Sequence, residues 1–138
     1  MSILPPKDAI PVVAAVVMRA ERVLLCQRHG GNHLPLMWEF PGGKIEHGES
    51  PSAALRRELR EELDVDSTIG PQLATVVHPY PDKTVWIRFF SATLRGSLRP
   101  LVHRALAWVP LQELPHYPVP PPNARIVEGL LNGELSFH

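Results

Sequence analysis

One stretch of the sequence, residues 51–63, constrains the fold of this chain more than any other. Ser50 is a favourable N-cap, and Pro51 fits the first position of an α-helix. Three leucines recur at every fourth position, namely Leu55, Leu59 and Leu63. This spacing places them on one face, so the sequence predicts a helix from about Pro51 to Leu63 that packs against a core. Asp64 is expected to end the helix, although glycine suits the left-handed conformation of such a position better.

The same helix gathers three carboxylates on one side. Glu58, Glu61 and Glu62 fall on an arc of roughly 100° when each residue turns the helix by about 100°. Glu58 and Glu62 form an i,i+4 pair of like charge, which costs an isolated helix about 0.2–0.5 kcal/mol. A divalent cation would remove this repulsion, because Mg²⁺ binds carboxylates together with substrate phosphates. A solvated charged surface would not require the spaced Gly43 and Glu49 ahead of the helix.

Apolar and β-branched runs predict strands on both sides of the helix. The expected strands are Ile10–Met18, Val23–Gln27, Leu73–Val77, Thr84–Leu94 and Ala105–Val109. The stretch PGGKIEHGES, residues 41–50, is expected to be loop because of its glycines and proline. Five prolines in residues 115–122 predict an irregular connection. Asn123 is then expected to cap a last helix over residues 124–132, which Gly133 closes.

The composition is typical of a globular protein, and its 138 residues predict a single domain that spans residues 1–138. Fourteen basic and fourteen acidic side chains cancel, which argues against a nucleic-acid polymer or a membrane surface as partner. The apolar run Ile10–Met18 is too short to span a bilayer. Cys26 is the only cysteine, so we expect a reducing, cytoplasmic location. The expected oligomeric state is a monomer or a homodimer.

Residues 43–65 read GKIEHGESPSAALRRELREELDV. This stretch resembles the signature of the Nudix hydrolases, G-x5-E-x7-R-E-U-x-E-E-x-G-U, in which U is aliphatic. Only Asp64 departs from it, at a position where the family usually has glycine. With residue frequencies of roughly one in fifteen, a chance match of the six polar or glycine positions is on the order of one in ten million per start site.

The resemblance implies a fold and an activity. The fold is of the α/β (α+β) class, a Nudix-type α/β/α sandwich around a mixed β-sheet. Flanking segments such as EFPGGKIE and PPPNARIVEGL look like the MutT-like branch, which hydrolyses nucleoside triphosphates. The implied reaction uses Mg²⁺, or Mn²⁺ in its place, and yields a nucleoside monophosphate and pyrophosphate. The favoured substrate is 8-oxo-dGTP, whose removal sanitises the nucleotide pool and so serves DNA repair.

Two alternatives stay open. Pyrimidine triphosphates, dinucleoside polyphosphates or nucleotide sugars could replace 8-oxo-dGTP without any change in the chemistry. A non-catalytic module that recognises a nucleotide or a lesion is the alternative from another class. The retained carboxylates of Glu58, Glu61 and Glu62 argue against such a module.

The resemblance also assigns roles to single residues. The implied metal ligands are Glu58, Glu61, Glu62 and the carbonyl of Gly42. Glu61 and Glu62 would also orient the attacking water. Arg57 and Glu49 complete the implied catalytic set as a pair that fixes the loop to the helix, a pairing that suits the fork of the guanidinium group.

Four residues are candidate substrate contacts: Asn123, Phe40, Glu39 and Arg28. Asn123 matches the asparagine with which the MutT-like branch contacts an oxidised guanine. An amide offers an acceptor beside a donor, which pairs with N7–H and O6 of the oxidised base but not with the two acceptors of guanine. Phe40 would stack on a base or belong to the core. Arg28 would reach a phosphate or a base, or remain solvated.

One family residue is absent. Many relatives have a glutamate six residues before the tryptophan of the last strand, used as a further metal ligand or as the general base. Counting back from Trp108 leads to Val102. The adjacent His103 is then a candidate base near neutral pH, with a solvated loop histidine as the alternative.

Overall fold

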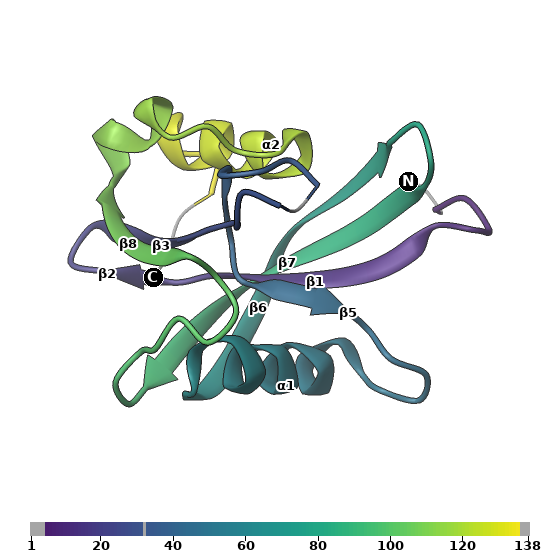
Figure 1. The fold of residues 1–138 in the computed structure, drawn as a ribbon, viewed down its shortest axis with the longest axis horizontal. Helices are drawn as coiled ribbons and strands as arrows, with labels where there is room; N and C mark the ends of the chain where they lie inside the picture. The colour runs from purple at the N-terminus through teal and green to yellow at the C-terminus, as the bar shows by residue number, and fades with distance from the viewer. Residues whose placement is uncertain (1–4, 32, 136–138) are drawn as a thin grey trace.

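A four-stranded sheet lies between two α-helices in the computed structural model, which describes residues 5–31 and 33–135 (Figure 1). Its strand order is β5-β1-β7-β6, formed by Gly42–Lys44, Ile10–Val16, Thr84–Arg95 and Asp66–Pro79. β1 runs parallel to β7, whereas β5 and β6 pair antiparallel with their neighbours. The sheet is therefore mixed, and the expected α/β/α arrangement is confirmed.

A smaller sheet is built around β3. β3, Arg22–Gln27, pairs antiparallel with three strands: β2, Met18–Arg19; β4, Trp38–Glu39; and β8, Ala105–Pro110. The expected strand Ile10–Met18 is thus divided, because β1 ends at Val16 and β2 starts at Met18 with a different partner. β4 leads directly to β5 and so connects the two sheets.

Side chains of the central strands alternate between two cores, because successive residues of a strand point to opposite faces. In β1, Val13 and Ala15 belong to the core that α1, Pro51–Leu63, covers. Ala14 and Val16 belong to the core that α2, Pro121–Leu131, covers. The three leucines of the predicted stripe, Leu55, Leu59 and Leu63, are fully buried under α1. Figure 1 shows the two helices on opposite sides of the sheet.

Helix α1 begins and ends as its sequence predicts. The Ser50 hydroxyl accepts a hydrogen bond from the Ala53 N–H at 3.1 Å. Asp64 adopts the left-handed conformation, with φ 59° and ψ 43°, and its N–H donates to the Arg60 carbonyl. A β-carbon is strained in this conformation, and this is the position at which the Nudix signature has glycine.

One strand was not predicted, and another was predicted too short. Residues 42–44 were expected to be loop, but they pair with β1 as β5. β6 begins at Asp66 rather than at Leu73, although its first half contains Gly70 and Pro71. The register shifts twice between Ile69 and Ala74, and Pro71 has no partner in β7 there. Such a bulge accommodates a proline, which has no N–H to donate.

The start of the last helix was also predicted wrongly. α2 begins at Pro121, and its N-cap is Pro120 rather than Asn123. Prolines fit the first helical turn because its N–H groups have no partner within the helix. The preceding connection contains a 3₁₀ helix, Leu111–His116. No helix within residues 5–31 and 33–135 is long and apolar enough to cross a membrane.

We predict that Asp64→Gly raises the free energy of unfolding by about 0.5–1 kcal/mol, since it relieves the left-handed strain but adds freedom to the unfolded chain. Urea denaturation would measure the change. Asp64→Asn is the matched control, because it keeps a β-carbon and removes only the exposed ion pair with Arg99 at 3.5 Å, worth about 0.5 kcal/mol or less. A glycine variant less stable than the wild type would contradict the account.

Candidate active site

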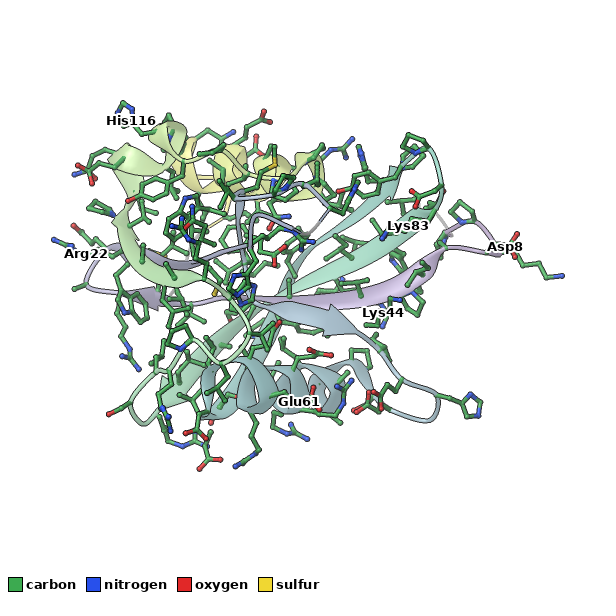
Figure 2. The ribbon with its side chains drawn as sticks, in the orientation of Figure 1. Asp8, Arg22, Lys44, Glu61, Lys83 and His116 are labelled. Carbon is green, nitrogen blue, oxygen red and sulfur yellow. The ribbon has the colours of Figure 1, made fainter. Side chains whose placement is uncertain are left out.

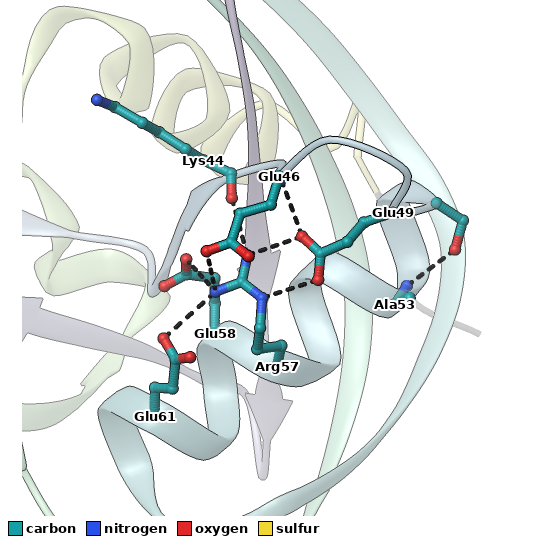
Figure 3. A network of polar contacts seen from close by, with 8 residues as sticks. Lys44, Glu46, Glu49, Ala53, Arg57, Glu58 and Glu61 are labelled. Carbon is teal, nitrogen blue, oxygen red and sulfur yellow. Dashed lines mark hydrogen bonds and ion pairs between the residues drawn. The ribbon is translucent and has the colours of Figure 1, made fainter.

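Arg57 connects the loop after β5 to helix α1 (Figure 3). Its Nε and Nη2 donate to the two carboxylate oxygens of Glu49, each at 2.8 Å. Nη2 also donates to the Lys44 carbonyl at 3.1 Å, while Glu49 accepts the N–H of Glu46 at 2.9 Å. The expected pairing of Arg57 with Glu49 is therefore present, and it fixes the loop at several points.

This pairing also sets the charge of both partners. The hydrogen bonds from Arg57, and secondarily the one from the Glu46 N–H, lower the pKa of Glu49 to about 2. The hydrogen bond to Glu49 is in turn the main reason that the pKa of Arg57 is raised. Both groups are therefore ionised at neutral pH, and the loop stays attached to the helix by a charged, bidentate contact.

The three carboxylates of α1 lie beside this contact but differ in exposure. Glu58 and Glu61 accept hydrogen bonds from Nη1 of Arg57 at 3.0 and 3.3 Å. Glu62 instead accepts the N–H of Gly42 at 2.9 Å. The Glu61 side chain, labelled in Figure 2, is 57% exposed and that of Glu58 is 15% exposed, whereas Glu62 is buried. The three carboxylates that the sequence places on one arc of the helix thus extend from the solvent, at Glu61, to the protein interior, at Glu62.

Glycine is required at two positions beside these carboxylates. A β-carbon on Gly43 would lie 2.5 Å from Cδ of Glu58, so the glycine leaves the space that this carboxylate occupies. A β-carbon on Gly42 would lie 2.0 Å from the carbonyl oxygen of Val13 in the neighbouring strand. Gly42 therefore permits the pairing of β5 with β1, and Gly43 permits the close approach of Glu58.

Burial makes the carboxylate group of Glu62 hard to ionise. Its pKa is raised to about 8, chiefly by burial and further by the charges of Glu58, Glu39 and Glu61, against which the Gly42 N–H works. Burial also raises the pKa of Glu58, although Arg57 opposes the shift. In the protein without a cation, the inner end of this cluster is therefore a poor place for negative charge.

The donor set has the chemistry of a divalent-cation site. Three carboxylates on one helical arc supply the hard oxygen ligands that Mg²⁺ prefers, and Gly43 leaves room for one of them. Within the described ranges, no three His, Cys, Asp or Glu side chains are grouped so that they could hold a metal ion as they stand. Glu58 and Glu61 are turned to Arg57 and Glu62 to Gly42, so binding a cation would require these side chains to rotate.

A cavity of about 310 Å³ opens beside this cluster. Its wall includes Gly42, Gly43 and Glu62, and it also includes Asn123 of α2. α1 and α2 lie on opposite sides of the sheet (Figure 1), and the cavity is lined by Glu62 of α1 as well as by Asn123 of α2. Its size and mixed lining suit a small ligand.

Asn123 is oriented by the backbone of the segment that joins the two sheets. Its Oδ1 accepts the Phe40 N–H at 3.1 Å, and the residue is 7% exposed. The amide oxygen is therefore turned to Phe40, and the amide NH₂ remains as its donor. The Phe40 ring is buried and packs edge-to-face on Phe89 with the centroids 6.0 Å apart. This ring belongs to the core, and the expectation that it stacks on a base is not supported.

Glu39 is held from two sides in the cavity wall. Nη1 of Arg28 contacts both of its oxygens, at 3.1 and 3.3 Å, so Arg28 is paired rather than merely solvated. Nε2 of His103 lies 2.8 Å from Oε2. His103 is 6% exposed, so the alternative of a solvated loop histidine is wrong. Because Nε2 contacts Glu39 and Nδ1 is buried with no hydrogen-bond partner among the described residues, His103 is not placed to act as the general base.

The cavity wall also contains residues that the sequence did not indicate. Tyr80 and Lys83, the latter labelled in Figure 2, belong to the turn between β6 and β7. Tyr80 packs edge-to-face against His33 with the centroids 5.3 Å apart. Val102, at the position of the absent glutamate, also lines the cavity and is 52% exposed. The turn sequence YPDK predicted the hairpin, but no local signal shows that its tip reaches the cavity.

Comparison with known proteins agrees with this geometry. A model of the NUDIX domain matches residues 9–130. The chain is 34% identical to the CTP pyrophosphohydrolase of Escherichia coli K12 over 88% of this chain and 91% of that protein. It is 40% identical to the 8-oxo-dGTP diphosphatase of Proteus vulgaris over 63% and 79%. The solution structure of the E. coli ORF135 protein superposes with a TM-score of 0.82 at 33% identity, covering 92% of this chain and 91% of that one.

The fold, the signature and the relatives all indicate the same class of protein. The mixed sheet between two helices carries the signature loop and helix in the arrangement described above. The match to the domain covers more than half of the chain. The chain therefore belongs to the Nudix hydrolase family.

We predict that Gly43→Ala lowers turnover by about tenfold or more, because the added β-carbon displaces the carboxylate of Glu58, and small displacements in active sites are costly. The melting temperature should change little, since the atoms in the way end a flexible side chain. Gly31→Ala is the matched control, because a β-carbon there would lie more than 4 Å from every described residue other than its chain neighbours. A Gly43→Ala variant as active as the Gly31→Ala variant would contradict the assignment.

We further predict that the wild type without divalent cations loses stability as the pH rises from about 4.5 to about 8. The raised pKa of Glu62 means that the folded protein holds this proton more tightly than the unfolded chain does. The contribution is thus full below the ordinary value of 4.5 and is lost above about 8, at roughly 1.4 kcal/mol per pKa unit. Thermal melts with EDTA would measure the loss. Glu62→Gln should remove this part of the pH dependence, and identical profiles for both proteins would contradict the prediction.

Proposed function

We propose that the chain is a Mg²⁺-dependent nucleoside triphosphate pyrophosphohydrolase and that 8-oxo-dGTP is its best substrate. The observation that carries the proposal is that Glu62 and the oriented amide of Asn123 line the same cavity. The part of this cavity beside Glu62 suits the phosphates, and the part beside Asn123 suits a base. Relatives named 8-oxo-dGTP diphosphatase and CTP pyrophosphohydrolase support the same chemistry.

The reaction is a substitution at phosphorus. The oxygen of a water molecule forms a bond to the phosphorus, the bond to the bridging oxygen breaks, and the products are a nucleoside monophosphate and pyrophosphate. Glu58, Glu61 and Glu62, with the carbonyl of Gly42, are the residues that would hold Mg²⁺, or Mn²⁺ in its place. When bound, the cation makes a coordinated water more acidic and offsets the charge of the phosphate oxygens.

The protein side chains supply position and charge around this centre. Glu61, at the exposed end of the cluster, is proposed to orient the attacking water together with Glu62. Arg57 keeps the loop and Gly43 against the helix while it is bound to Glu49. Its Nη1 group contacts Glu58 and Glu61 and becomes available to a phosphate oxygen when those carboxylates turn to a cation.

Asn123 is proposed to distinguish the oxidised base from guanine. Its NH₂ donates to O6 of either base, while the second lone pair of Oδ1, the first being bound to the Phe40 N–H, accepts N7–H of the oxidised base. Guanine has a lone pair instead of a hydrogen at N7, and a buried group left unpaired costs about 1–3 kcal/mol. The oxidised nucleotide is therefore favoured.

CTP is the second candidate substrate. The E. coli relative named CTP pyrophosphohydrolase matches along most of both chains. The carboxylate of Glu39 lines the same cavity and could accept a hydrogen bond from the amino group of cytosine. In either case the enzyme is proposed to act as a single domain in the reducing cytoplasm, without a macromolecular partner of another kind. Removal of a damaged or surplus nucleotide there protects DNA synthesis.

Pyrophosphate release from 8-oxo-dGTP, dGTP and CTP in the presence of Mg²⁺ would test the proposal. Hydrolysis of 8-oxo-dGTP with a higher kcat/KM than dGTP is the expected result. Glu61→Gln should lower kcat by about a hundredfold or more and leave the fold intact, because the group acts on the reacting water. No turnover of any nucleoside triphosphate, or full activity of this variant at saturating Mg²⁺, would refute the proposal.

We predict that Asn123→Ala loses the preference for 8-oxo-dGTP over dGTP by about tenfold or more, because the variant has no oxygen to accept N7–H of the oxidised base. It also leaves the Phe40 N–H without its acceptor and should be less stable by about 1–3 kcal/mol. Asn123→Asp is the matched comparison, because it keeps oxygens for the Phe40 N–H and for N7–H but has no NH₂ to donate to O6, so kcat/KM should fall for both nucleotides while the preference and the melting temperature remain. Equal losses on both nucleotides in the alanine variant would show that Asn123 does not select the base.

A further inference from the structure

His103 is a buried histidine that the reaction described above does not use. Its side chain is 4% exposed, its Nε2 lies 2.8 Å from Oε2 of Glu39, and its Nδ1 is buried with no hydrogen-bond partner in residues 5–31 and 33–135. Since a carboxylate oxygen accepts, Nε2 must carry the hydrogen and donate it. Burial of a polar ring for this one contact indicates that the contact has a role.

The segment that carries His103 is fixed at both ends. The Leu101 N–H donates to the carbonyl of Glu62 at 3.0 Å, and the Arg104 N–H donates to the carbonyl of Gln27 at 2.9 Å. The first bond joins the segment to the helix that bears the three carboxylates, and the second joins it to β3. The imidazole is therefore held in a defined position relative to the cluster on α1.

The two carboxylate oxygens of Glu39 differ in their contacts. Oε2 contacts both His103 and Arg28, whereas Oε1 has one partner among the described residues, Nη1 of Arg28 at 3.1 Å. The Glu39 side chain is 21% exposed and lines the cavity. A carboxylate has about four acceptor positions, so Oε1 can still accept a hydrogen bond from a ligand.

We infer that His103 is a positioning residue for base recognition. It holds Glu39 so that Oε1 accepts an N–H or NH₂ group of the nucleobase, while the NH₂ of Asn123 donates to a neighbouring acceptor. In 8-oxoguanine these groups are N1–H and the adjacent O6, and in cytosine they are the amino group and the adjacent N3. This inference rests on the proposed function, because it names the group of the nucleotide that the cavity reads.

Steady-state kinetics of His103 variants would test the inference, with 8-oxo-dGTP or CTP as substrate, whichever the wild type hydrolyses with the higher kcat/KM. His103→Leu keeps the volume but has no donor, so KM should rise about tenfold while kcat changes by less than about twofold. His103→Gln brings an amide N–H to about the place of Nε2 and should keep KM within about threefold of the wild type. If the leucine variant does not fold, His103→Asn replaces it, because its shorter amide does not reach Glu39.

A double-mutant cycle with Glu39→Gln separates positioning from packing. If His103 acts through Glu39, His103→Leu should raise KM no further in the Glu39→Gln background. The inference would be overturned if the effects of the two substitutions on KM multiply. It would also be overturned if His103→Gln is as impaired as His103→Leu, or if kcat falls at unchanged KM. A wild type without turnover of either nucleotide would instead refute the proposed function itself.

Discussion

The bidentate contact between Arg57 and Glu49 is the interaction on which the rest of the site depends. It joins the loop after β5 to helix α1, next to the point where Gly43 of β5 lies against the carboxylate of Glu58. The same guanidinium group lies against Glu58 and Glu61, so it offsets the repulsion between them. A helix with this density of acidic groups is tolerated because a cation of the protein itself is within contact distance.

The carboxylate of Glu62, at the buried end of the cluster, has a different environment from those of Glu58 and Glu61. Glu62 is buried and receives an N–H from Gly42 but no cationic side chain, and its pKa is raised to about 8. A buried group that resists ionisation lowers stability at neutral pH, and this is typical of sites shaped for a ligand rather than for stability. Arg57 thus balances the exposed part of the cluster, while the buried part lacks a partner that a divalent cation would supply.

The structural features that depend on residues close in the sequence were predicted correctly. The contacts that depend on residues far apart in the sequence were missed. Helix α1, its Ser50 cap and the left-handed Asp64 follow from local preferences and were found correctly. β5 was missed because three residues rich in glycine form a strand only against β1. The contact of Asn123 with Phe40 joins positions 83 residues apart, and that of His103 with Glu39 joins positions 64 residues apart. No periodicity in a single sequence contains such pairings, so neither contact was predicted. Asn123 was expected to contact the base and to cap the last helix, and His103 was expected to be a candidate base or a solvated loop residue.

The central claim is that the carboxylates of α1 bind a divalent cation, and electron paramagnetic resonance of Mn²⁺ tests it most directly. Protein added to a Mn²⁺ solution should decrease the signal of the free ion, because bound Mn²⁺ has a broadened spectrum. The account predicts this decrease for the wild type and its loss in a Glu58→Gln/Glu62→Gln double variant that remains folded. Equal binding by the wild type and the double variant, or no binding by the wild type, would contradict the account.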